Sequence, residues 1–176
     1  MEKTLSDTLK YALDSSIFIE AKNRYYSFDL CPGFWDALLW HHNRNLLSSI
    51  DRIKAELDRG DDDLTKWINK TMPKTCFVST DDPEVIRWFG QIVTWVQAQS
   101  QFIQAAKADF AKVADGWLIA YAKANNLVLV THEVYNQFAK GKVKIPNVCK
   151  AFNVTCVDTF DMLKDLKTSF IWKSPS

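Results

Sequence analysis

Short apolar runs alternate along this chain with segments in which apolar residues recur at every third or fourth position. The runs are apolar over most of their length, as is typical of strands that are covered on both faces of a parallel sheet. They occupy residues 10–14, 46–49, 76–79, 127–131 and 154–158. The pattern therefore predicts a sheet of about five strands.

Between these runs the apolar spacing is helical. One helical segment follows Pro32, and another opens with Asp82 as its cap and Pro83 at its first helical position. A third begins at Asp115, and the last follows Asp158. Neighbouring parallel strands need crossover connections, which are usually helical. We therefore predict an α/β fold, a three-layer sandwich with a mostly parallel central sheet.

The length and composition predict one domain. The chain has 176 residues, of which 47% are hydrophobic, and a chain of this size buries about two-thirds of its unfolded surface. No internal repeat or Gly/Ser linker divides it, so we predict a single domain over residues 1–176 with a core at about 11–166. The formal charge of +1 argues against disorder and against a uniformly basic surface. Any contact with nucleic acid must therefore be local.

Targeting signals are weak. The longest apolar stretch, 117–122, is far shorter than the roughly 18 residues of a membrane span, so no membrane passage is expected. Glu2 and Asp7 interrupt the N-terminus before a signal-peptide core could form. The cysteines lack C-x-x-C spacing, and we interpret them as small buried hydrophobes in a reducing compartment. We expect a cytoplasmic protein with free thiols at Cys31, Cys76, Cys149 and Cys156.

Acidic residues stand where such a fold gathers its ligands, beyond the carboxyl ends of the strands. Asp14 ends the first predicted strand, and Glu133 lies just after the fourth. Asp115 opens a helix, and Glu56 lies on a short predicted helix, 50–57, after the second strand. Each has a plainer interpretation as a cap, a turn residue or part of a solvated helix face.

If these acids lie close together in the fold, the repulsion between their negative charges must be reduced. Two unit charges about 5 Å apart at an effective dielectric of about 20 repel by about 3 kcal/mol. A cluster of carboxylates therefore either protonates some members, with a raised pKa, or binds a cation. Oxygen ligands alone favour a hard ion such as Mg²⁺ or Mn²⁺, and such a site suits hydrolysis of phosphodiester bonds.

The order of these segments resembles PIN-domain ribonucleases. The resemblance rests on Leu13-Asp14-Ser15-Ser16, Lys54-Ala55-Glu56-Leu57, the run Ala114-Asp115-Gly116-Trp117-Leu118-Ile119-Ala120-Tyr121-Ala122, and Val130-Thr131-His132-Glu133. Segments 17–26 and 144–149 look similar to an uncharacterised PIN-like branch related to the VapC-type toxins of toxin–antitoxin pairs. The resemblance extends from about residue 11 to about 163.

The resemblance implies a hydrolase, an Mg²⁺- or Mn²⁺-dependent endoribonuclease that acts on RNA. It implies a metal pocket of Asp14, Glu56, Asp115 and Glu133. Ser16 and Thr131 would orient a carboxylate or a metal-bound water. PIN sequences commonly carry aspartate at the position of Glu133, so the number and placement of metal ions stay open. The VapC-type relatives imply the toxin of a pair whose partner is a separately encoded antitoxin.

A basic segment lies near the end of the chain, without an acid among its members: Lys140, Lys142, Lys144 and Lys150. It is either a soluble surface or an RNA-binding edge that contacts phosphates. Lys22, Arg24 and Arg44 would extend that edge, and Tyr25 and Tyr26 would stack on unpaired bases.

Two alternative functions stay open. A catalytically inactive PIN-like module would bind RNA or protein without cutting. A phosphatase of the haloacid type would need a second aspartate where Ser16 stands.

Trp88 and Trp95 share one face of a predicted helix, which makes a homodimer a candidate assembly. His132 and the acidic run 61–63 are interpreted as a non-catalytic residue and a helix opening.

Overall fold

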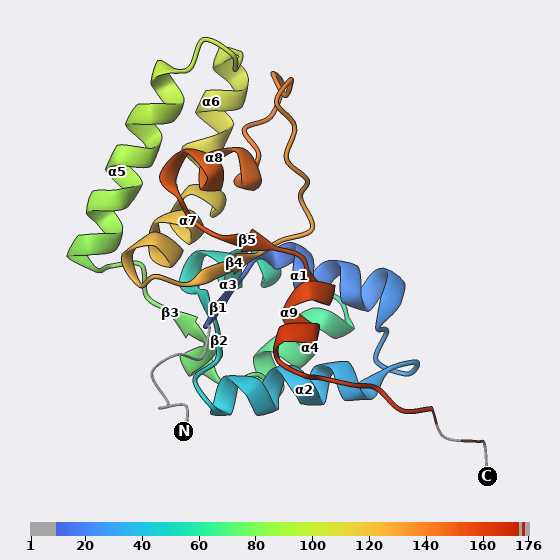
Figure 1. Ribbon diagram of the computed structural model, residues 1–176. Coiled ribbons are helices and arrows are strands. Elements are labelled where there is room, and N and C mark those ends of the chain that lie inside the picture. Colours follow the sequence, from blue (N-terminus) through green and yellow to red (C-terminus); the bar gives the residue numbers. More distant parts are fainter. Residues whose placement is uncertain (1–9, 173, 175–176) are drawn as a thin grey trace, which may run out of the picture.

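The computed structural model describes residues 10–172 and 174 and contains one five-stranded sheet (Figure 1). The strands follow the order β3-β2-β1-β4-β5, and every neighbouring pair is parallel. Each strand overlaps one of the predicted apolar runs, so the predicted parallel sheet is confirmed. Their bounds are β1 (Tyr11–Leu13), β2 (Leu47–Ile50), β3 (Phe77–Val78), β4 (Val128–Val130) and β5 (Cys156–Val157).

Helices cover both faces of the sheet, which confirms the three-layer sandwich. Helix α7 packs on β1, β2 and β4, with α5 and α8 against it, while α2, α4 and α9 lie on the other side of the sheet (Figure 1). The helices are α1 (Ser15–Glu20), α2 (Pro32–Asn43), α3 (Asp51–Leu57), α4 (Asp63–Lys70), α5 (Pro83–Ala98), α6 (Gln104–Phe110), α7 (Asp115–Ala124), α8 (Ile145–Phe152) and α9 (Thr159–Asp165), with a π-helix η2 (Ala21–Tyr25) and a 3₁₀ turn η3 (Lys74–Cys76).

The central strands explain why the apolar runs are nearly continuous. Every residue of β1 and β4 is buried, because helices cover both faces of these strands. Among the described helices, none is long and apolar enough to cross a membrane.

Helix starts follow the predicted chemistry. Asp82 caps α5, and its Oδ1 accepts hydrogen bonds from the backbone N–H groups of Glu84 at 2.9 Å and Val85 at 3.2 Å. Asp62 caps α4 by accepting from Thr65 N at 3.0 Å. The acidic run 61–63 is therefore a helix opening, as expected.

The chain order reverses beside β1, which is the point where such folds form a crevice. Strand β1 is followed by β2 on one side in the sheet, and β4 pairs with β1 on its other side. Crevices of α/β folds open beyond the carboxyl ends of strands at such a switch. The carboxyl ends of β1 and β4 therefore mark the position at which a site is expected.

A long segment between β4 and α8, which we call loop 132–144, rises beside α6 (Figure 1). Its backbone is tied to the turn between α5 and α6. Gln101 Nε2 donates to the carbonyls of Gln137 at 2.9 Å and Ala139 at 2.8 Å, and Ile103 N donates to Lys140 O at 3.1 Å. This loop and the α5–α6 pair therefore form one connected wall.

The tryptophans of α5 are used inside the fold. Trp88 and Trp95 both pack edge-on against Phe152 of α8, with ring centroids 6.5 and 5.9 Å apart from it. This contact accounts for their shared helix face, and a homodimer stays a prediction. All four cysteines are free; Cys76 and Cys149 are buried as expected, whereas Cys31 and Cys156 are partly exposed.

Candidate functional site

Asp14 lies at the carboxyl end of β1 and is almost fully buried, with 4% of its surface exposed. It is also the N-cap of α1, where its Oδ1 accepts from Ser15 N at 2.8 Å. Its Oδ2 accepts from Ser16 Oγ at 2.6 Å and from Thr131 Oγ1 at 2.8 Å. The short apolar strand and the cap together hold this carboxylate in one orientation.

Ser16 and Thr131 also connect Asp14 to the start of loop 132–144. Ser16 Oγ accepts from His132 N at 3.2 Å, and Thr131 Oγ1 accepts from Glu133 N at 3.2 Å. Each hydroxyl therefore donates to the carboxylate and accepts from the loop backbone. His132 turns its ring to Thr159, with Nε2 2.9 Å from the hydroxyl oxygen.

Glu133 has partners on both carboxylate oxygens. Oε2 accepts from the backbone N of Ile145 at 2.8 Å, at the start of α8. Oε1 forms an ion pair with Lys142 Nζ. The Glu133 side chain is 18% exposed and that of Lys142 is 62% exposed. The lysine therefore reaches the carboxylate from the solvent side.

Asp115 is the first residue of α7, and Glu56 contacts the same helix start. Glu56 Oε1 accepts from the backbone N of Ala114, the N-cap, at 3.2 Å. A Cβ added at Gly116 would approach Phe89 Cε2 to 3.0 Å and Phe110 Cε1 to 3.1 Å. Glycine after Asp115 therefore lets the helix start pack closely against the aromatic rings of α5 and α6.

The pKa of Asp115 is raised from 3.8 to about 7. Burial is the main cause, followed by the negative charges of Asp14 and Glu133, with a further contribution from Glu56, while Lys142 opposes the rise. The positive end of a helix would favour the ionised form by about 0.3–1 kcal/mol. Burial and repulsion outweigh that effect. The fold therefore brings all four sequence-predicted acids into one electrostatic cluster.

A cavity of about 350 Å³ opens at this cluster. Glu56, Asp115 and Lys142 line it, together with Asp109 of α6, which the sequence patterns did not indicate. Its apolar wall is formed by Ala106, Phe110, Val113 and Val143. Burial lowers the pKa of Lys142, but the ion pair with Glu133 and the charges of Asp115 and Asp14 outweigh it, so the pKa is raised. The ammonium therefore stays charged.

The donor chemistry of the cluster fits a hard divalent ion, because carboxylates and hydroxyls are its ligands. The raised pKa of Asp115 also indicates negative charge that a cation would stabilise. Within residues 10–172 and 174, no group of three His, Cys, Asp or Glu side chains is placed to hold a metal ion. The types of donor group therefore fit a divalent ion, but the described side chains do not converge on a single ion position.

The lysines of the predicted basic edge have different partners in the structure. Lys142 pairs with an acid of the cluster, Lys144 Nζ donates to Val134 O at 3.4 Å, and Lys150 lies over the Tyr135 ring at 4.6 Å. Lys140 is exposed. Among the described residues, one of these four lysines therefore forms an ion pair with an acid, and the other three do not.

The residues expected to extend that edge have other partners. Lys22 forms an ion pair with Asp62 at 2.8 Å, and Arg24 forms one with Glu20 at 2.9 Å. The guanidinium of Arg44 stacks 3.5 Å from the centre of the Trp40 ring.

The two tyrosines of this region differ in exposure. Tyr26 stacks on Phe34 at 4.6 Å and is partly buried, so packing explains it. Tyr25 is 51% exposed and contacts Phe160 edge-on.

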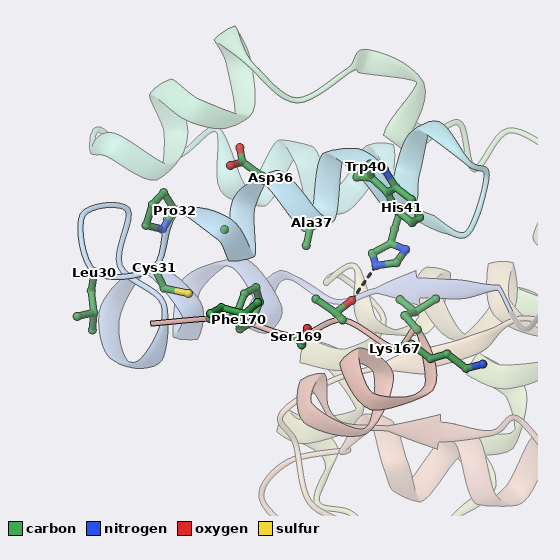
Figure 2. Close-up of a pocket in the computed structure, with 14 residues that line it drawn as sticks. Leu30, Cys31, Pro32, Asp36, Ala37, Trp40, His41, Lys167, Ser169 and Phe170 are labelled. Atoms are coloured by element: carbon green, nitrogen blue, oxygen red, sulfur yellow. Dashed lines mark hydrogen bonds between the residues drawn. The ribbon is translucent and has the colours of Figure 1, made fainter. Parts of the chain in front are cut away.

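A larger cavity, of about 700 Å³, lies elsewhere, between α2 and the segment after α9 (Figure 2). His41 borders it and its Nε2 lies 2.8 Å from Thr168 Oγ1. The pKa of His41 is lowered by burial and by Arg44, so the ring is neutral near pH 7. The rest of the wall is largely apolar, including Pro32, Trp40 and Phe170. The lining of this cavity includes a single carboxylate, Asp36, so it is not a second acidic cluster.

The fold is similar to two solved structures. FitAcB from Neisseria gonorrhoeae matches with a TM-score of 0.51 and 17% identity, over 83% of this chain and 95% of that chain. VapBC2 from Rickettsia felis, solved bound to a DNA fragment from its promoter, matches with a TM-score of 0.52 and 13% identity, over 85% of this chain and 98% of that chain. These likenesses show the fold, which is PIN-like and related to that of VapC-type proteins.

The family of the chain follows from its sequence. A family of domains of unknown function, DUF4411, matches residues 11–170, and the chain belongs to it. No curated protein matches the sequence significantly.

Proposed function

We propose that this protein is a metal-dependent endoribonuclease. The observation that carries the proposal is the pKa of Asp115, which burial and the charges of Asp14, Glu133 and Glu56 raise to about 7. Such a rise is typical of carboxylates that share a small space, and perturbed titration in a cleft indicates a functional site. The PIN-like fold supports the reaction class, because the sequence resemblance implies a ribonuclease.

Asp14, Glu56, Asp115 and Glu133 would hold Mg²⁺ or Mn²⁺ in this proposal. When bound, such an ion supplies an activated water and stabilises the negative charge that develops on the phosphate. Ser16 and Thr131 act as positioning residues, since their hydroxyls donate to Asp14 Oδ2 at 2.6 and 2.8 Å. They hold that carboxylate in one orientation.

The substrate proposal rests on the basic residues of loop 132–144 and of α8, the segments that follow Thr131 in the chain. Lys140, Lys144 and Lys150 carry exposed or partly exposed side chains on loop 132–144 and α8. Contacts from lysines to phosphates position a nucleic acid without reading its sequence. We propose that these three lysines bind the RNA backbone beside the acidic cluster.

An antitoxin is proposed as the protein partner. The resemblance to VapC-type toxins supports it, and so does the fold likeness to FitAcB and VapBC2. Co-expression with the product of a neighbouring gene, followed by size-exclusion chromatography, tests this partner. Failure to co-purify with any such product would count against the toxin role and would leave the nuclease proposal standing.

Cleavage of structured RNAs tests the nuclease proposal. Wild type, Asp14→Asn and Asp115→Asn are compared with Mn²⁺ and with a chelator. We expect both variants and the chelator to reduce cleavage at least a hundredfold, because each removes a charged ligand or the ion. Asp36→Asn is the control, since Asp36 is exposed and borders the other cavity. Cleavage that neither site variant affects would refute the proposed site.

A second candidate function is a catalytically inactive module that binds RNA or protein. The ion pair between Lys142 and Glu133 favours it, because a lysine in an acidic cluster neutralises the charge that a metal ion would otherwise meet. RNA binding without cleavage by the wild-type protein would favour this alternative over the nuclease.

A further inference from the structure

The ion pair between Lys142 and Glu133 differs from the other ion pairs of the described residues in its position. The others join neighbours on one helix or surface side chains such as Lys22 and Asp62. Lys142 instead borders the acidic cavity together with Asp115 and Glu56. Its ammonium group is therefore placed where a bound cation would also be attracted.

The loop backbone holds Lys142 in this position. The two residues on either side of its short turn, Ala139 and Val143, are buried at 8% and 2% exposure. Asn147 of α8 is bonded twice to Asn136, since Asn136 N donates to Asn147 Oδ1 at 3.1 Å and Asn147 Nδ2 donates to Asn136 O at 2.8 Å. Hydrogen bonds to the turn between α5 and α6 anchor the loop from the other side. The direction of the lysine is thus set by packed structure.

The side chain of Lys142 can move away from Glu133 into solvent. It is 62% exposed, so its ammonium can return to water without crossing protein. Glu133 would keep its other contact, from Ile145 N to Oε2, and the carboxylate would still be fixed beside the cluster. The lysine contact can therefore break without unfolding the loop.

We propose that Lys142 is a displaceable counter-ion of the acidic cluster, which competes with a divalent cation for the Glu133 carboxylate. This inference rests on the proposed metal site. In the metal-free protein the ammonium partly neutralises the cluster; on metal binding it leaves Glu133, and the ion takes its place. Lys142 then lowers the affinity for metal and is not one of the lysines that bind RNA in the metal-free state.

The test is the binding of Mn²⁺, measured by isothermal titration calorimetry without RNA. Wild type is compared with Lys142→Met, which keeps the side-chain length and removes the charge. Lys140→Met is the matched control, since it removes one positive charge from the same loop at an exposed position. We expect Lys142→Met to bind Mn²⁺ about tenfold more tightly than wild type, and Lys140→Met to change the affinity less than twofold.

A double-mutant cycle with Glu133→Gln separates competition from a general effect of charge. If Lys142 competes for Glu133, the gain from Lys142→Met disappears in the Glu133→Gln background. Thermal unfolding of each variant without metal shows that it is folded, and Lys142→Ala replaces Lys142→Met if the latter is not.

The outcomes distinguish this inference from the proposed function. Equal gains for Lys142→Met and Lys140→Met, or a gain that persists with Glu133→Gln, would overturn the counter-ion. Binding to wild type that Lys142→Met leaves unchanged would also overturn it, while the proposed metal site survives. Binding to neither wild type nor Lys142→Met would overturn both.

Discussion

The two aspartates of the site are held in opposite ways. Asp14, at the end of β1, is buried and its carboxylate accepts three hydrogen bonds. Asp115, at the start of α7, accepts no hydrogen bond on its side chain among the interactions of the described residues, and its pKa is raised to about 7. The fold therefore supplies hydrogen-bond donors to the carboxylate of Asp14 and buries the carboxylate of Asp115 without any from the described residues.

The two carboxylates therefore differ in what they contribute to the stability of the fold. A buried carboxylate with several donors contributes to folding, because it satisfies backbone and hydroxyl groups that would otherwise be unpaired. A carboxylate without such partners lowers stability when it ionises. Under the proposed function a bound ion would account for Asp115, whereas Asp14 also has a role in the fold, as the cap of α1.

The largest expected effect is the loss of stability in Asp14→Ala. The change removes the cap of α1 and leaves the donors Ser15 N, Ser16 Oγ and Thr131 Oγ1 without their acceptor. We expect the free energy of unfolding to fall by about 2–3 kcal/mol, measured by urea denaturation at pH 7 with a chelator. Asp115→Ala is the control, and an equal loss in that variant would refute the contrast.

A smaller loss is expected for Thr131→Val, which keeps the shape of the side chain and removes its hydroxyl. Asp14 then loses one donor, and Glu133 N loses its acceptor. The free energy of unfolding should fall by about 1–2 kcal/mol. Thr155→Val, at an exposed position of the loop before β5, is the matched control. Hydrogen exchange at the amide of Glu133 should accelerate in Thr131→Val, and an unchanged rate would count against the network.

The smallest expected effect, of the opposite sign, is a gain of stability in Asp115→Asn. The folded pKa of about 7 lies above the ordinary value of 3.8, so the folded protein holds this proton more tightly than the unfolded chain. Stability therefore falls as the pH rises from about 4 to 7, and the full penalty is present above 7. The pKa difference alone would correspond to about 4 kcal/mol. Asp115 keeps partial contact with water, and screening there reduces the expected penalty to about 1 kcal/mol.

Asparagine at this position removes the penalty. Metal-free Asp115→Asn should unfold at higher urea than wild type at pH 8 and together with wild type near pH 4. A constant difference between the two proteins across this pH range would show that Asp115 does not titrate as described.

Much of the framework was predictable because it rests on local patterns. Apolar runs marked the strands, and Asp62 and Asp82 marked helix starts, since a cap needs only its own neighbours in the chain. Asp14 was predictable for the same reason, because it directly follows an apolar run. Helices α6 and α8 were not predicted as helices from the spacing of apolar residues.

Contacts between distant segments were not predictable from these patterns. Lys142 stands in a row of lysines and was expected at an RNA-binding edge, but the loop turns it toward Glu133. Tyr26 was expected to stack on bases, but it stacks on Phe34 instead. Asp109 carries no motif, and only the packing of α6 brings it to the acidic cavity.

The sequence by itself determined where along the chain the strands and several of the helices lie, and it placed acids at the ends of strands, because hydrophobic periodicity and capping act over a few neighbouring residues. Only the tertiary structure decided that Asp14 and Asp115, which are far apart in the chain, lie close enough for their negative charges to repel. It also decided that Lys142 neutralises part of that charge. Electrostatic interaction depends on distance in space and on burial, and neither quantity is written in the spacing of residues along the chain.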